Sequence, residues 1–107
     1  MSSTKYPVGV IGGGAWGTAL ASVLAQIHDG VLLWAREQEV VTGINEAHEN
    51  AAFLPNLTLS PKIAATGDLT RMAECGALLI VTPAQHVRAT LSALPQTSAP
   101  LLLCAKG

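Results

Sequence analysis

Three glycines near the N-terminus, Gly12, Gly14 and Gly17, have the spacing GxGxxG within the segment GGGAWG. Between a strand and a helix, the first glycine of this pattern forms a tight turn, the second lets the backbone approach a pyrophosphate, and the third lets helix and strand pack closely. The pyrophosphate charge would rest on the free amides of the helix N-terminus. The spacing alone is a weak signal, because glycine is common in turns and methyltransferases use related loops. It predicts a dinucleotide site only between a strand and a helix.

The sequence around the glycines supplies those elements. Residues 8–11 and 31–34 are short apolar runs typical of buried strands, and residues 15–27 carry apolar side chains at helical spacing. A right-handed crossover makes the two strands parallel, so this stretch is predicted to be a βαβ unit. The glycine motif then lies between its first strand and its helix, which favours dinucleotide binding over a mere turn.

Further elements follow along the chain. We expect a helix between Arg36 and about Asn50, strands at residues 62–66, 77–81 and 101–104, a short helix capped by Asp68 and ending near Cys75, and a helix begun by Thr82 and Pro83. Five strands with helical connections predict an α/β Rossmann fold, a doubly wound parallel sheet with strand order 3-2-1-4-5.

Arg36 stands nineteen positions after Gly17, about where the fingerprint expects an acidic residue for the ribose 2′-hydroxyl. An arginine can form a bidentate pair with a 2′-phosphate, which a carboxylate would repel. We therefore expect NADP(H) to be accepted. The alternative is a solvated arginine at a helix start, a position that disfavours a cation. Arg36 also argues against an S-adenosylmethionine-dependent methyltransferase, for which an acidic residue is expected there.

Composition excludes other classes. The 107 residues carry a formal charge of −1, and 50% of them are hydrophobic, which fits one folded domain. The cations are scattered singly and aromatic residues are few, so nucleic acid is not an expected partner. No apolar stretch approaches the roughly 20 residues of a membrane span, and we expect a cytoplasmic protein. The two cysteines, Cys75 and Cys104, are expected to be reduced and packed, and no metal site is predicted.

Most of the other distinctive side chains are expected to have structural roles. We interpret His28, His48 and His86 as helix-end or helical side chains rather than as acids or bases, and Pro83 and Gln85 as helix-start residues. Trp34 is expected in the core, whereas Trp16, within the glycine loop, would cover a bound cofactor.

The segments GGGAWGTALA, VLLWAR, ENAAFLP, VTPAQ and LLLCAKG together resemble the N-terminal domain of bacterial-type NAD(P)-dependent glycerol-3-phosphate dehydrogenase, over residues 6–107. The resemblance implies a Rossmann domain for NAD(H) or NADP(H), in an enzyme that interconverts dihydroxyacetone phosphate and glycerol 3-phosphate by hydride transfer and feeds phospholipid synthesis. It matches Ala15, Trp16 and Arg36 to residues that contact the cofactor, and Lys106 to a lysine beside both cofactor and substrate. Ala15 is often serine in relatives, which leaves this chain only the backbone contact there.

The same resemblance places the catalytic lysine and most substrate contacts in a second, mainly helical domain. We therefore expect residues 1–107 to be one NAD(P)-binding domain of a longer enzyme, without catalytic residues or turnover of its own. A non-catalytic NAD(P)-sensing module, or a related dehydrogenase of the 6-phosphogluconate or ketopantoate type, is the alternative. The apolar terminal strand at residues 101–104 would favour association, so a homo-oligomer is a further expectation.

Overall fold

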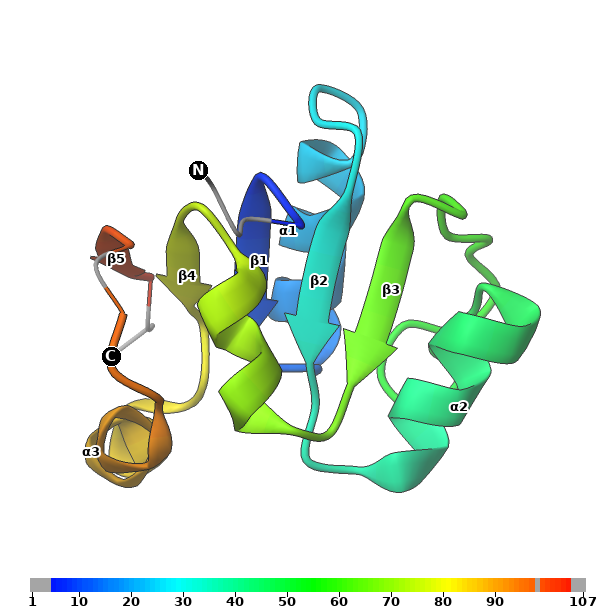
Figure 1. The fold of residues 1–107 in the computed structure, drawn as a ribbon. Helices are drawn as coiled ribbons and strands as arrows, with labels where there is room; N and C mark the ends of the chain where they lie inside the picture. Colours follow the sequence, from blue (N-terminus) through cyan, green and yellow to red (C-terminus); the bar gives the residue numbers. More distant parts are fainter. Residues whose placement is uncertain (1–4, 98, 105–107) are drawn as a thin grey trace.

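The computed structural model describes residues 5–97 and 99–104, which form a three-layer α/β domain (Figure 1). Its elements follow the chain in the order β1 (Val8–Ile11), α1 (Ala15–Leu24), β2 (Val31–Trp34), α2 (Gln38–Ala47), β3 (Ile63–Thr66), the 3-10 helix η1 (Leu69–Glu74), β4 (Leu78–Ile80), α3 (Ala84–Ala93) and β5 (Leu101–Leu103). The strands form one sheet of order β3-β2-β1-β4-β5, and every neighbouring pair is parallel. The predicted fold class and strand order are confirmed.

The two faces of the sheet bury separate apolar cores. Val8, Val10, Val31 and Leu33 belong to a core that includes residues of α1 and α2. Leu32, Trp34, Leu78 and Ile80 belong to a core that includes Met72 of η1, and the partly buried Val87 of α3 packs against it. Successive strand residues point to opposite faces, so β2 is buried along its whole length. The crossovers therefore lie on both sides, as a doubly wound sheet requires.

The helices are shorter than the apolar spacing predicts. Helix α1 ends at Leu24 rather than near residue 27. Ile27 is 72% exposed, so core packing does not stabilise a further helical turn there. Helix α2 ends at Ala47, where the left-handed backbone of His48 (φ 54°) stops it. Asn50 therefore lies beyond the helix.

Asp68 and Thr82 differ in their capping roles. The Asp68 carboxylate accepts hydrogen bonds from the Thr70 hydroxyl (2.6 Å) and the Thr70 N–H (3.0 Å), and these bonds lower the pKa of Asp68. The predicted cap is confirmed, although the helix is of the 3-10 type. The predicted cap by Thr82 is wrong, because Pro83 occupies the N-cap of α3 and makes no side-chain bond there.

Candidate functional site

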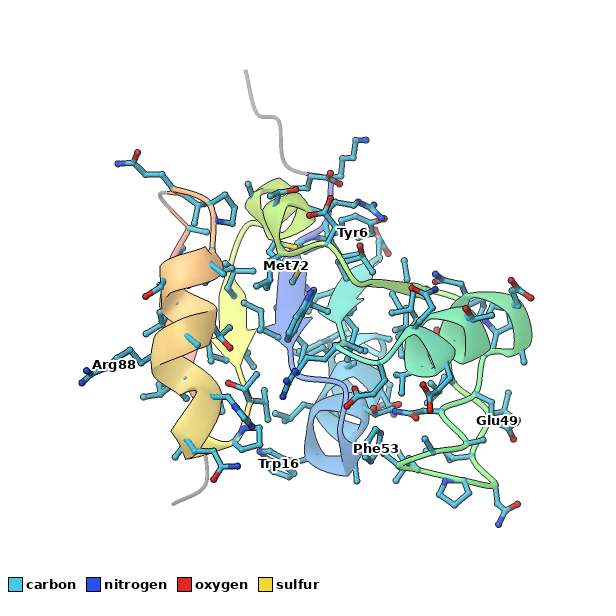
Figure 2. All side chains as sticks on the ribbon, turned by 90° about the horizontal axis from the view of Figure 1, so that it is seen from below. Tyr6, Trp16, Glu49, Phe53, Met72 and Arg88 are labelled. Atoms are coloured by element: carbon cyan, nitrogen blue, oxygen red, sulfur yellow. The ribbon has the colours of Figure 1, made fainter. Side chains whose placement is uncertain are left out.

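A pocket of about 460 Å³ lies at the carboxyl edge of the sheet. Three stretches of chain line it: the glycine loop after β1, the residues that end and follow β2, and the residues that follow β4, joined by Phe53. Figure 2 views this edge and shows Trp16 and Phe53 on either side of the start of α1. In open α/β sheets ligands bind in the crevice outside the carboxyl ends of the strands, where the strand order reverses. Here the order reverses between β1 and β4.

The three predicted glycines have different surroundings. Gly12 has φ +137°, a conformation that side chains rarely adopt. A Cβ on Gly17 would collide with the carbonyl oxygen of Gly12, so close approach of α1 to the loop needs glycine there. A Cβ on Gly14 would meet no atom of residues 5–97 and 99–104 within 4 Å. The backbone at Gly14 therefore borders open space, at the beginning of α1.

The beginning of α1 can bind an anion. Gly14 is the N-cap residue, and no side chain of the described residues caps the helix. The amides of the first turn have no intrahelical partner, and the helix dipole makes this end electropositive. Ala15 and Trp16 are exposed and line the pocket beside these amides.

Arg36 lies on the same pocket, just after β2. Its side chain is exposed, and among the residues that the structure describes it forms no ion pair. Glu37 lines the pocket beside it and is the N-cap of α2. The guanidinium is thus available to an anionic ligand that enters from the glycine loop.

Two buried polar atoms on pocket-lining residues have no protein partner among the described residues. They are the indole Nε1 of Trp34, whose residue is 9% exposed, and the hydroxyl Oγ1 of Thr82, whose residue is 3% exposed. Burying an unpaired polar group costs free energy, and a polar ligand in the pocket would relieve that cost. Together with the open space above Gly14, these atoms fit a dinucleotide.

The structure brings most of the predicted site residues together. Gly12, Gly14, Ala15, Trp16, Gly17 and Arg36 all line this one pocket. Lys106 lies outside the described residues. Pro83 also lines the pocket, and so does His86, whose predicted role was only that of a helical side chain. Figure 2 shows Arg88, from α3, pointing outward on the side of that helix away from Trp16.

Sequence reasoning missed one buried residue behind the pocket. Asn50 is 1% exposed and donates a hydrogen bond to the Gly13 carbonyl, 37 positions away in sequence. It belongs to the segment ENAAFLP, which carries part of the family resemblance but received no site role. Only that segment gave a signal, because spacing in sequence does not show which loops meet.

Other functional groups are sparse in the part of the chain that the structure describes. It contains no cluster of His, Cys, Asp or Glu that could bind a metal ion. None of its helices has the length and hydropathy needed to cross a membrane. Both cysteines are free, and burial raises the pKa of the Cys75 thiol to about 11.

Comparisons with known proteins agree with this geometry. A family model described as NAD-dependent glycerol-3-phosphate dehydrogenase N-terminus matches residues 7–107. The NAD(P)+ glycerol-3-phosphate dehydrogenase of Parvibaculum lavamentivorans is 54% identical over 110 residues, covering 100% of this chain and 33% of that protein. The enzyme of the same name from Caulobacter vibrioides is 53% identical, covering 97% and 32%. The chain thus spans about a third of the length of these curated relatives.

Solved structures show the same fold. Glycerol-3-phosphate dehydrogenase from Coxiella burnetii is 30% identical, with a TM-score of 0.78 over 96% of this chain and 33% of that chain. The enzyme from Plasmodium falciparum, at 24% identity, supports the fold alone, with a TM-score of 0.83 over 94% and 32%. Since the family match begins just before β1 and includes the whole glycine loop, the chain belongs to the family of NAD-dependent glycerol-3-phosphate dehydrogenase N-termini, the NAD(P)-binding part of these enzymes.

Proposed function

We propose that the pocket binds NAD(H) or NADP(H), with the pyrophosphate over residues 12–17 and the adenosine ribose beside Arg36. One observation carries this proposal. The open space above Gly14, the unpaired amides at the start of α1 and the Arg36 side chain all border a single pocket at the carboxyl edge of the sheet. A dinucleotide has a pyrophosphate and a ribose that match these groups in kind and order.

The chain's residues bind and orient the cofactor in this proposal. The first-turn amides neutralise the pyrophosphate, Trp16 (52% exposed) covers it, and Trp34 Nε1 and Thr82 Oγ1 are available for hydrogen bonds. Ala15 contributes its backbone only. The nicotinamide, when bound, supplies or accepts the hydride.

The whole protein would interconvert dihydroxyacetone phosphate and glycerol 3-phosphate. The proposal is supported by the activity named for relatives of which this chain spans about a third. Hydride transfer to a ketone needs a proton donor and a held substrate. Lys106 would contribute to cofactor and substrate binding, and the other groups would come from the remaining two thirds. We place the protein in the cytoplasm, which the free cysteines support.

Titration calorimetry of the full chain with NADPH and NADH tests the cofactor site. Gly14→Val should abolish binding of both, because the side chain fills the space proposed for the pyrophosphate. Arg36→Ala should lower the affinity for NADPH by about tenfold or more, since hydrogen bonds to charged groups contribute about 1.5–3 kcal/mol. The affinity for NADH should be unchanged. Arg88→Ala is the matched control, because Arg88 is exposed on α3 away from the pocket.

Three results would contradict the proposal. The first is equal affinity for the cofactors in wild type and Gly14→Val. The second is an equal loss of affinity for NADPH and NADH in Arg36→Ala, and the third is a loss of NADPH affinity in Arg88→Ala as large as in Arg36→Ala.

The chain without the rest of the enzyme should oxidise neither NADH nor NADPH in the presence of dihydroxyacetone phosphate, measured as absorbance at the nicotinamide band. Sustained oxidation that Lys106→Ala removes would show that the catalytic groups lie within these residues.

A further inference from the structure

The Asn50 side chain links two walls of the pocket that are far apart in sequence. Its amide Nδ2 donates to the Gly13 carbonyl oxygen (2.9 Å) and to the Thr18 hydroxyl (2.8 Å). Its Oδ1 accepts from the N–H of Phe53 (3.3 Å). The glycine loop and the Phe53 turn are therefore joined through one carboxamide.

The chemistry of the partners assigns the donor and acceptor ends of this carboxamide. A backbone carbonyl can only accept and a backbone N–H can only donate, so Nδ2 must face Gly13 and Oδ1 must face Phe53. Thr18 Oγ1 accepts a hydrogen bond from Asn50 and donates its own hydroxyl hydrogen to the Gly14 carbonyl (2.8 Å). An aspartate of the same shape could not donate to Gly13. The network requires an amide.

The network lies inside the protein, beneath the loop. Asn50 and Thr18 are each 1% exposed, and neither lines the pocket. In a region of low dielectric such hydrogen bonds are strong, and losing one partner leaves another buried group unsatisfied. The Gly13 carbonyl is thereby anchored toward Asn50.

That anchoring sets the direction of the neighbouring amide. The Gly13 carbonyl and the Gly14 N–H belong to one planar trans peptide, so the two groups point in opposite directions. With the carbonyl directed inward at Asn50, the Gly14 N–H is directed away from it, at the residue that borders the open space of the pocket. A peptide unit free to rotate would present its carbonyl oxygen, which repels an anion, part of the time.

We propose that Asn50 is a positioning residue for cofactor binding, which fixes the Gly13–Gly14 peptide so that its N–H faces the pyrophosphate. The inference rests on the proposed function, because it concerns the same pocket. Asn50 itself does not contact the ligand, because its side chain does not line the pocket. Its effect should therefore be confined to ligands that carry a pyrophosphate.

Binding of two ligands to the full chain separates positioning from general damage. NADPH has a pyrophosphate, whereas adenosine 2′-monophosphate has only the part proposed to lie beside Arg36. Asn50→Ala should lower the affinity for NADPH by about tenfold or more, because it removes hydrogen bonds to buried groups. The affinity for adenosine 2′-monophosphate should be unchanged. Thr18→Val should act in the same direction, and Thr18→Ser, which keeps the hydroxyl, should restore binding.

Asn45 provides a matched control. Its side chain also makes two hydrogen bonds to backbone, donating to the Ala65 carbonyl (2.9 Å) and accepting from the Ala65 N–H (2.8 Å), but it connects α2 to β3 outside the pocket. Asn45→Ala should lower thermal stability and leave both affinities unchanged. All affinities are measured at a temperature at which thermal melts show every variant folded.

Each result decides the inference. The inference would be overturned if Asn50→Ala lowered the affinity for both ligands equally. It would also be overturned if Asn50→Ala and Asn45→Ala had the same affinity for NADPH. If Asn50→Ala does not fold, Thr18→Val against Thr18→Ser decides in the same way, and equal NADPH affinity in those two would overturn it. A wild-type chain that fails to bind NADPH would overturn the proposed function and this inference together, whereas wild-type binding with an unaffected Asn50→Ala overturns this inference alone.

Discussion

Replacing Gly17 with alanine should destabilise the fold, although alanine is the better helix former. An added Cβ would overlap the Gly12 carbonyl oxygen and lie 3.0 Å from the Gly12 carbonyl carbon. Both are backbone atoms, so no side-chain rotation relieves the contact. Backbone hydrogen bonds hold the loop in place, because the Gly12 N–H donates to the Trp34 carbonyl (2.9 Å) and the Val81 N–H donates to the Ile11 carbonyl just before it (2.9 Å). Helix α1 must therefore move away from the sheet.

Moving α1 disturbs a packed face. Thr18 and Ala21 of this helix are 1% and 0% exposed, so the displacement opens contacts with the core. Overpacking of this kind costs about 1–3 kcal/mol, and the better helix propensity of alanine returns at most about 1 kcal/mol. We expect a net loss of about 1–2 kcal/mol, which lowers Tm by roughly 4–15 °C in a domain of this size.

Gly14→Ala is the control for this prediction. Its Cβ meets nothing within 4 Å, and its φ of −74° suits any residue. The poorer N-cap propensity of alanine and the reduced entropy of the unfolded chain nearly cancel, at about 0.5–1 kcal/mol each. Gly14→Ala should melt close to wild type and still bind NADPH weakly. Thermal unfolding followed by circular dichroism checks both variants, and equal Tm values for Gly17→Ala and Gly14→Ala would refute the steric reasoning.

Two further predictions concern the core and the sheet edge. Burial raises the pKa of Cys75 to about 11 from an ordinary value of 9.0, so the folded state retains this proton longer than the unfolded state, and stability should fall as pH rises from about 9 to 11. Urea unfolding over that range checks this, and a wild-type pH dependence identical to that of Cys75→Ala would contradict it. Leu101, Leu102 and Leu103 are 49%, 55% and 65% exposed on the terminal strand β5, so the chain should self-associate with rising concentration and Leu102→Lys should reduce this. Sedimentation checks that expectation, which a strictly monomeric wild type at high concentration would overturn.

Local sequence was sufficient for the strands and their order. Residues 8–11 and 31–34 coincide with β1 and β2, because a short apolar run buried on both faces is marked by its own composition. The handedness of crossovers predicted parallel neighbours, and the order 3-2-1-4-5 is that of the dinucleotide-binding fold to which the glycine motif points. The glycine loop and Arg36 could also be found by counting, since the strand, turn and helix that bring them to one pocket are nearly contiguous in the chain.

Only the tertiary structure decided how the site is supported and where elements stop. The positions of Asn50 beneath Gly13, of Phe53 and His86 on the pocket, and of the buried Thr82 hydroxyl depend on which loops meet at the carboxyl edge of the sheet. These tertiary contacts join residues that are tens of positions apart, and the local periodicity of the sequence does not predict them. The end of α1 likewise depended on where the core ceases to cover the helix, as the exposed Ile27 shows. Burial is a property of the packed chain, because the same apolar side chain stabilises a helix only where another element lies against it.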